Sequence, residues 1–284
     1  MLATKLKSEK STFILPDPFY PVYATAGQYT SKKMLAISVY KEENYLINLE
    51  KITKEVWSDT IAFYLCSPSN PQGTIADDQY LEDLYELSLK HQFIIIADEC
   101  YSEIYRTKSP NSILKISEKN NFKNILSFNS LSKRSNAPGL RSGYVMGDIN
   151  IIREFFNLRN VAAPTVPTPI QIASEALWAD EEHVINNRKL YNEKFDTFHS
   201  ILDKKFNFQI PEGGFFAWLD ISGFGTDESV TIKLWQSGVK VIPGSYLSLN
   251  SDKNPDSKKF IRIALVGSND EISKATSIIN KVIN

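Results

Sequence analysis

Short apolar runs alternate with helical patterns over the first two thirds of the chain, and this alternation restricts the fold more than any other feature. Several of the runs are apolar on both faces, which is typical of strands buried on both sides. The runs of strand length are residues 11–16, 34–40, 61–66, 93–97, 124–129 and 143–147. Strand–helix–strand alternation predicts an α/β domain of three layers, in which helices pack on a mostly parallel sheet.

One helix between these strands can be placed closely. Residues 77–92 carry Leu81, Leu84 and Leu87 on one side, and the segment starts with acidic residues, which suit the positive end of a helix dipole. An amphipathic helix is therefore expected here, with its apolar side against the sheet.

A second, smaller region follows and has a different order of elements. Residues 181–205 predict one long helix with a buried stripe, made of Val184, Tyr191, Phe195, Phe198 and Leu202. Strands are expected at 213–221, 239–243 and 260–266, and a last helix at 270–283. We therefore predict a large domain over residues 1–185 and a small α+β domain over residues 186–284.

Composition excludes several classes of protein. The 284 residues have a formal net charge of −1, which gives no electrostatic reason to expect nucleic acid or a membrane surface as a partner. The longest apolar runs have strand length, and the lysines near the start are not followed by the apolar core of a secretory signal. Cys66 and Cys100 form no disulfide framework, and the histidines stand too far apart for a metal site. A cytoplasmic protein is expected.

The ends of three strands carry most of the reactive side chains. In parallel α/β sheets, ligands bind beyond the carboxyl ends of the strands. Polar side chains that could bind a ligand follow each of the strands at 61–66, 93–97 and 124–129. They are Asn70, Asp98, Tyr101, Ser130, Ser132, Lys133 and Arg141.

Each of these groups has an ordinary structural alternative. Asp98 could cap a strand end, and Asn70 with Pro71 could form only a turn. Lys133 alone is most often a solvated lysine, and Arg141 alone an ion-pair partner. The evidence for a site is their joint occurrence, in order, at successive strand ends.

Pyridoxal 5′-phosphate is one cofactor that uses all of these groups. It needs a lysine to bind its aldehyde covalently and an acid beside its ring nitrogen. It also needs hydrogen-bond donors to the ring O3′, which an amide and a phenol supply. Hydroxyl groups and an arginine bind its phosphate, because the guanidinium fork matches phosphate geometry.

The chain resembles the class I/II aminotransferases, which are pyridoxal-phosphate enzymes of fold type I. The matching elements run in family order across nearly the whole chain. They are "PDPFYPVY", "SPSNPQG", "DECYSEIY", "SLSKRSNAPGLRSGY", "PEGGFFAWLD", "VIPGSYL" and "FIRIAL". Two of them, "SLSKRSNAPGLRSG" and "DECYSEIY", most resemble the succinyldiaminopimelate aminotransferase branch, near the aspartate aminotransferases.

The resemblance implies a role for each residue at the strand ends. Lys133 binds the cofactor aldehyde and then moves a proton between the substrate and the cofactor, for which it must act as a neutral amine. Asp98 pairs with the pyridinium nitrogen, and Asn70 and Tyr101 donate to O3′. The implied phosphate ligands are Ser130, Ser132 and Arg141.

Further roles follow from the same resemblance. Tyr20 would stack on one face of the ring and Cys100 would lie against the other, although either residue could equally be core packing. Arg262 would bind the substrate α-carboxylate. It alternates with Ile261 and Ile263 in a predicted strand, so it should face a site or solvent. The resemblance also implies a cis peptide bond between Asn70 and Pro71.

One departure from the family pattern concerns the N-terminal side. Family chains begin well upstream of "PDPFYPVY" and include a glycine-rich loop and helix start that donate N–H groups to the cofactor phosphate. This sequence contains no such element, so the large domain is expected to be incomplete at its N-terminal side.

The resemblance implies transfer of an amino group between an amino acid and a 2-oxo acid, within a homodimer. Glutamate is the expected donor and N-succinyl-2-amino-6-oxopimelate the first acceptor to test. An aspartate aminotransferase, a β-lyase of the same fold and a chain without catalysis remain alternatives.

Overall fold

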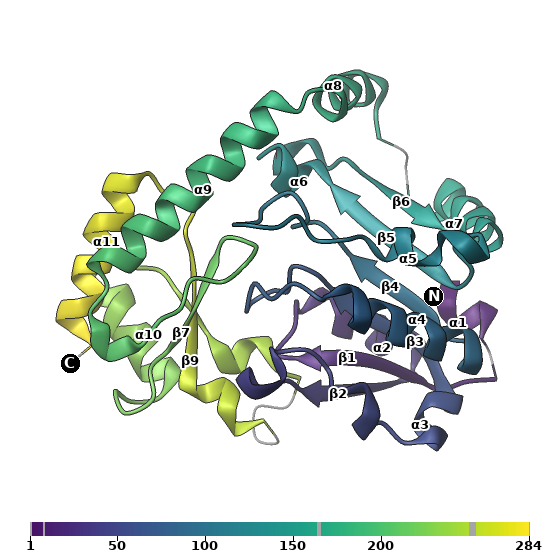
Figure 1. Ribbon diagram of the computed structural model, residues 1–284, viewed down its shortest axis with the longest axis horizontal. Helices are drawn as coiled ribbons and strands as arrows, with labels where there is room; N and C mark the ends of the chain where they lie inside the picture. The colour runs from purple at the N-terminus through teal and green to yellow at the C-terminus, as the bar shows by residue number, and fades with distance from the viewer. Residues whose placement is uncertain (1, 8, 164–165, 250–253, 284) are drawn as a thin grey trace.

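The computed structural model describes residues 2–7, 9–163, 166–249 and 254–283, which form a large and a small domain (Figure 1). The large domain contains a six-stranded sheet with the order β2-β1-β3-β4-β5-β6, in which only β6 is antiparallel to its neighbour. The strands are β1 (Thr12–Asp17), β2 (Lys33–Ser38), β3 (Thr60–Cys66), β4 (Ile94–Asp98), β5 (Ile125–Ser130) and β6 (Gly143–Gly147). The predicted mostly parallel α/β sheet is confirmed.

Helices cover both faces of this sheet. Alternate residues of one strand face opposite sides, so Ile14 packs with α3 (Lys54–Asp59), α4 (Asp78–His91) and α5 (Ile113–Ser117). Phe13 packs on the other face with α1 (Leu2–Leu6) and α7 (Ile149–Ala162), and Leu15 packs there with α2 (Val22–Thr30). The result is the expected arrangement of three layers.

The helix predicted at 77–92 is confirmed as α4. It starts at the expected acidic residues because the Asp77 side chain accepts a hydrogen bond from the backbone N–H of Tyr80 and caps the first turn. Leu81 and Leu84 are buried under the sheet, and Leu87 packs at the edge of the same cluster.

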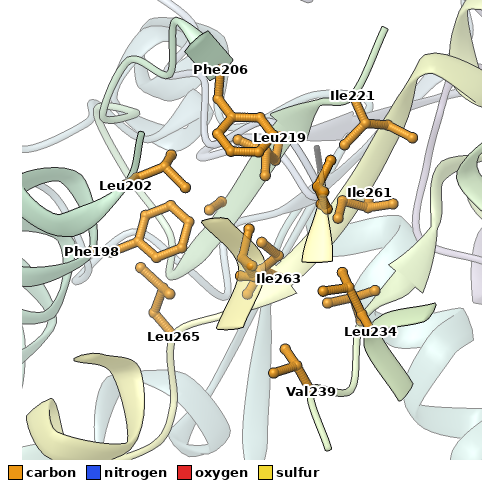
Figure 2. Packing of buried hydrophobic residues seen from close by; sticks show 14 of the residues in the cluster. Phe198, Leu202, Phe206, Leu219, Ile221, Leu234, Val239, Ile261, Ile263 and Leu265 are labelled. Carbon is orange, nitrogen blue, oxygen red and sulfur yellow. The ribbon is translucent and has the colours of Figure 1, made fainter. Parts of the chain in front are cut away.

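The small domain is built on a three-stranded antiparallel sheet of order β7-β9-β8. Its strands are β7 (Phe216–Asp220), β8 (Ile242–Pro243) and β9 (Phe260–Ala264), all shorter than the sequence indicated. Figure 2 shows its core, in which Phe198, Leu219, Ile261 and Ile263 are fully or almost fully buried. The buried stripe and the last helix are therefore placed as expected.

The helix α9 (Glu182–Ile201) connects the two domains. In Figure 1 it extends from α8 (Thr168–Ala179) to the small domain, where it packs against α11 (Asn269–Val282). The domain boundary proposed at residue 185 falls inside α9, because the chain continues from one domain to the other without leaving the helix. The remaining helix of the small domain is α10 (Asp227–Gln236).

Short helices complete the structure. The single turn α6 (Leu131–Arg134) follows β5 directly. The 3-10 helices are η1 (Lys41–Glu43), η2 (Leu49–Lys51), η3 (Glu118–Asn120), η4 (Pro138–Leu140), η5 (Lys204–Phe206), η6 (Gly244–Leu247) and η7 (Pro255–Lys259). Within the described ranges, no helix is both long enough and apolar enough to cross a membrane.

Candidate active site

Lys133 lies on the single turn of helix that follows strand β5, next to the edge strand β6. The turn begins at Ser130, whose Oγ accepts a hydrogen bond from the backbone N–H of Ser132 at 3.1 Å. The Lys133 side chain is partly buried, and its Nζ lies 5.0 Å from the ring centroid of Phe215 and 6.0 Å from that of Tyr101. The amine is therefore held against aromatic rings at the carboxyl end of the sheet.

The surroundings of Lys133 favour its neutral form. Burial lowers the pKa of Lys133, and the positive charges of Arg262 and Arg141 act in the same direction, while the carboxylate of Asp98 opposes them. The rings of Tyr101 and Phe215, from two separate segments, lie against the same amine. A buried amine with a lowered pKa is suited to accept a proton.

Asp98 is the last residue of β4, and its carboxylate receives one hydrogen bond on each oxygen. Oδ1 accepts from the backbone N–H of Cys100 at 3.1 Å, and Oδ2 accepts from the hydroxyl of Tyr23 at 2.5 Å. Hydrogen-bond donors thus satisfy both oxygens of this carboxylate beside an otherwise apolar cluster. The structural alternative, a simple strand-end cap, accounts for only the first of these two bonds.

Asn70, Tyr101 and Arg262 form a hydrogen-bonded chain across both domains. Asn70 Nδ2 donates to the Tyr101 hydroxyl at 3.4 Å, and Arg262 Nη1 donates to Asn70 Oδ1 at 2.9 Å. The Arg262 guanidinium lies 4.4 Å from the Phe216 ring, and its Nε is buried without a partner among the described residues. The Asn70–Pro71 bond is cis, as the resemblance implied.

Burial shifts the pKa values of the groups in this chain toward their neutral forms. It raises the pKa of Tyr101, with the nearby Asp98 adding to the effect and Arg262 opposing it. It lowers the pKa of Arg262, whose guanidinium remains charged in proteins. Tyr101 therefore remains a hydrogen-bond donor at neutral pH.

The predicted phosphate ligands lie in one loop but are not all in contact. Ser130 Oγ and Ser132 Oγ are 2.9 Å apart, so the structure brings these hydroxyls together. Arg141 is exposed and left-handed (φ 53°), and its Nη1 donates to the carbonyl of Pro138 at 2.7 Å. Within the described ranges it makes no hydrogen bond to either serine.

Tyr20 and Cys100 flank the same region. Tyr20 is 43% exposed and meets Tyr23 edge to face, with ring centroids 5.8 Å apart. The core-packing alternative is therefore wrong for Tyr20. Cys100 is partly buried, and burial together with the Asp98 charge raises the pKa of its thiol. Cys100 packs against the buried cluster that contains Tyr23, Cys66 and Tyr101.

Sequence reasoning missed three residues that contact this site. Tyr23 donates to Asp98, Phe215 packs on Lys133, and Asn187 of α9 donates to the Lys133 carbonyl at 3.1 Å. Tyr23 and Phe215 lie inside quoted family elements, but apolar runs and helices usually bury aromatic residues only for packing. No sequence signal marks Asn187, because it is one polar residue on a long helix.

The nearby cavity of about 790 Å³ is separate from these residues. Its walls are residues 39–42, 44–46, 72–75 and 77 of the large domain and residues from 206–222 and 256–260 of the small domain. None of the predicted site residues lines it. The chemistry is therefore assigned from the side-chain groups and not from the size of this cavity. The described residues contain no group of three or more His, Cys, Asp or Glu side chains that could hold a metal ion.

Comparison with known proteins agrees with the geometry of the site. A sequence model of the family "Aminotransferase class I and II" matches residues 1–279. The chain belongs to this family. The crystal structure of an aminotransferase from Neisseria meningitidis is 34% identical, with a TM-score of 0.91 over all of this chain and 73% of that one. The fold is therefore that of the aminotransferases.

Curated relatives of this aminotransferase-family chain include two named activities. An LL-diaminopimelate aminotransferase from Maridesulfovibrio salexigens is 28% identical over 95% of this chain and 69% of its own length. An aspartate aminotransferase from a Bacillus species is 29% identical over 84% of this chain and 63% of its own length. The chain thus spans about two thirds of the length of these relatives.

Proposed function

We propose that this chain transfers an amino group between an amino acid and a 2-oxo acid, with pyridoxal phosphate as cofactor. The observation that carries the proposal is the surroundings of Lys133. Its amine lies against the rings of Tyr101 and Phe215, and burial lowers its pKa. A lone solvated lysine would have none of these features.

The donor set fits pyridoxal phosphate. The Asp98 carboxylate has accepted two hydrogen bonds and retains lone pairs for a protonated ring nitrogen. Tyr101 and Asn70 are neutral donors on the neighbouring strand ends. The hydroxyls of Ser130 and Ser132 converge beside the lysine and would hold the phosphate together with Arg141. When bound, the cofactor supplies an electron-withdrawing ring that stabilises negative charge on the substrate α-carbon.

The protein residues have separate tasks in this proposal. Asp98 keeps the ring nitrogen protonated, because an ionised carboxylate favours a cation beside it. Lys133, as a neutral amine, would take the proton from the substrate α-carbon and deliver it to the cofactor. Arg262 and Asn70 bind the substrate α-carboxylate and so fix which bond of the α-carbon faces Lys133.

Two pairs of substrates are proposed, in the order in which they should be assayed. We infer glutamate as the amino donor and N-succinyl-2-amino-6-oxopimelate as the first acceptor. The relative named as an LL-diaminopimelate aminotransferase supports testing an acceptor related to diaminopimelate first. The relative named as an aspartate aminotransferase supports aspartate and 2-oxoglutarate as the second pair to assay. A homodimer is proposed from the family resemblance, and light scattering of the purified chain would test it.

The first experiment measures the visible absorption of the purified chain with added pyridoxal phosphate, beside a Lys133→Ala control. A cofactor band that requires Lys133 and changes when glutamate is added supports the proposal. Release of ammonia and a keto acid without any acceptor would instead identify a β-lyase. Absence of the band in the unmodified chain would contradict cofactor binding and favour a chain without catalysis.

A further inference from the structure

Tyr23 is the residue of the site whose role no sequence motif explained. It lies in the first turn of α2, and its hydroxyl donates to Asp98 Oδ2 at 2.5 Å. The other carboxylate oxygen accepts from the backbone N–H of Cys100. The Tyr23 hydroxyl is therefore an oxygen donor from a side chain to this carboxylate, and the Cys100 thiol, a weaker donor, is a second side chain that hydrogen-bonds to it.

The Tyr23 hydroxyl is held in one place by the packing of its ring. The ring is 7% exposed and stacks on Tyr64 with centroids 4.8 Å apart and an interplanar angle of 15°. The ring also contacts Tyr20 edge to face and belongs to the buried cluster that contains Leu15 and Cys66. A buried aromatic ring with neighbours on two sides has little rotamer freedom, so the direction of its hydroxyl is fixed by the core.

The chemistry of the hydroxyl suits a permanent donor. Burial raises the pKa of Tyr23 well above the usual range, and the nearby Cys66 and Asp98 act in the same direction. The phenol therefore stays protonated over the working pH range. A neutral donor on an ionised carboxylate forms a charge-assisted hydrogen bond, which is shorter and stronger than a neutral pair.

We infer that Tyr23 is a positioning residue that orients the Asp98 carboxylate toward the cofactor ring nitrogen. Fixing one carboxylate oxygen on Tyr23 and the other on the Cys100 N–H leaves the remaining lone pairs pointing in defined directions. The carboxylate then needs no reorganisation when a pyridinium binds. This inference rests on the cofactor role proposed for Asp98 in the section above.

The same contact connects two site residues that sequence reasoning treated separately. Tyr23 contacts Tyr20 edge to face and donates a hydrogen bond to Asp98. Tyr20 is proposed to stack on the cofactor ring and Asp98 to bind its nitrogen, so Tyr23 contacts both residues. Removing only the Tyr23 hydroxyl leaves both ring contacts in place. The hydroxyl can therefore be tested apart from the packing.

The test uses Tyr23→Phe with Tyr64→Phe as the matched control. Tyr64 stacks on Tyr23 and lies in the same region, but its hydroxyl makes no hydrogen bond to Asp98 within the described part of the chain. The dissociation constant for pyridoxal phosphate is measured by absorption for both variants, for Asp98→Asn, and for Asp98→Asn combined with Tyr23→Phe. Thermal unfolding of each variant without cofactor checks that it folds.

The inference predicts a specific pattern of affinities. Tyr23→Phe should weaken cofactor binding by roughly tenfold, as expected for one hydrogen bond to a charged group, whereas Tyr64→Phe should change it less than about twofold. In the Asp98→Asn background, Tyr23→Phe should have no further effect, because the hydroxyl acts through the carboxylate. Equal effects of the two tyrosine variants, or an undiminished effect in the Asp98→Asn background, would overturn the positioning role.

A second readout does not depend on the cofactor. Infrared difference spectra of the cofactor-free chain identify the Asp98 carboxylate stretch as the band lost in Asp98→Asn. Tyr23→Phe should shift this band and Tyr64→Phe should not. Suppose that Tyr23→Phe shifts the band but the unmodified chain binds no cofactor. The hydrogen bond is then confirmed, whereas the proposed function, and with it the positioning role, is wrong. If the band does not shift, the inference fails and the proposed function is unaffected.

Discussion

Arg262 of the small domain donates a hydrogen bond from Nη1 to Oδ1 of Asn70 in the large domain, at 2.9 Å and across 192 residues of sequence. Asn70 in turn donates to the hydroxyl of Tyr101, so groups from β9, the loop after β3 and the loop after β4 form one chain of hydrogen bonds. The two domains therefore build the site together. A substitution of Arg262 should therefore also affect Tyr101, which it reaches only through Asn70.

Arg262→Lys should raise the KM for the amino donor by roughly ten- to a hundredfold, and kcat should fall less. A lysine keeps the charge but loses the fork that binds a carboxylate with two parallel hydrogen bonds, each contributing about 1.5–3 kcal/mol to a charged partner. Steady-state kinetics with glutamate measure both constants. Arg153→Lys, at an exposed position of α7, is the control and should leave both unchanged. An equal KM for Arg262→Lys and the unmodified chain would exclude Arg262 from substrate binding.

Lys133→Met should raise the melting temperature of the cofactor-free chain. The pKa of Lys133 is lowered in the folded state, so folding disfavours its charged form, and the unmodified chain loses stability as pH falls below the amine's unfolded pKa. Methionine fills similar space without a charge. Because the lysine is only partly buried and solvent screens part of the effect, we expect a rise of about 2 °C at pH 7.

The pH dependence provides the control for this prediction. As pH rises toward 10, the folded chain releases the lysine proton before the unfolded chain does, so the destabilisation weakens and the difference in melting temperature between Lys133→Met and the unmodified chain should shrink. Calorimetry at pH 7 and pH 10 measures it. A difference that stays constant between these pH values would mean that packing, and not charge, accounts for the change.

The sheet and the loops beyond it could be predicted from the sequence because their signals are local. Apolar runs such as 93–97 mark strands, and the polar residues after them, including Asp98 and Lys133, converge once parallel strands align their carboxyl ends. Arg262 could be predicted to face away from Ile261 because side chains alternate along a strand.

The contacts between distant segments could not be predicted in the same way. Tyr23 reaches Asp98 across 75 residues, and nothing in its helix distinguishes a hydroxyl that binds an acid from a buried ring. The boundary at 185 fell inside α9 because a helix that belongs to two domains has no break in its apolar pattern. The three strands of the small domain were drawn too long, since apolar residues continue into the loops that flank them.

Asp17→Asn should change the pH dependence of stability through a contact between the domains. Asp17, at the end of β1, is 3% exposed and accepts hydrogen bonds from Ser248 at 2.9 Å and from Asn254 at 3.0 Å. Burial raises the pKa of Asp17, and the hydrogen bonds oppose the shift only in part. The folded state thus holds the proton more tightly, and stability is lost as pH rises from the unfolded pKa through the folded one.

An asparagine at position 17 has no charge to bury, so this loss with rising pH should disappear. The amide oxygen can still accept one of the two hydrogen bonds. We expect the unfolding free energy of Asp17→Asn, relative to that of the unmodified chain, to increase between pH 3 and pH 7. Urea unfolding at both pH values measures the change, and Asp256→Asn, on the partly exposed 3-10 helix η7, is the control. A relative stability that decreases over this range would contradict the raised pKa.

Ile261→Ala should cost the chain about 2–5 kcal/mol of unfolding free energy, the usual range for removing a large aliphatic side chain from a packed core. Ile261 of β9 is fully buried in the hydrophobic core of the small domain, which Figure 2 shows. Ile232→Ala is the matched control, because Ile232 lies on α10 in the same domain and is 57% exposed, and it should cost less than about 0.5 kcal/mol. Because the neighbouring Arg262 points from the same strand into the site, Ile261→Ala should also raise the KM for the amino donor. A loss of stability without any change in KM would show that β9 keeps its position when its core side is weakened.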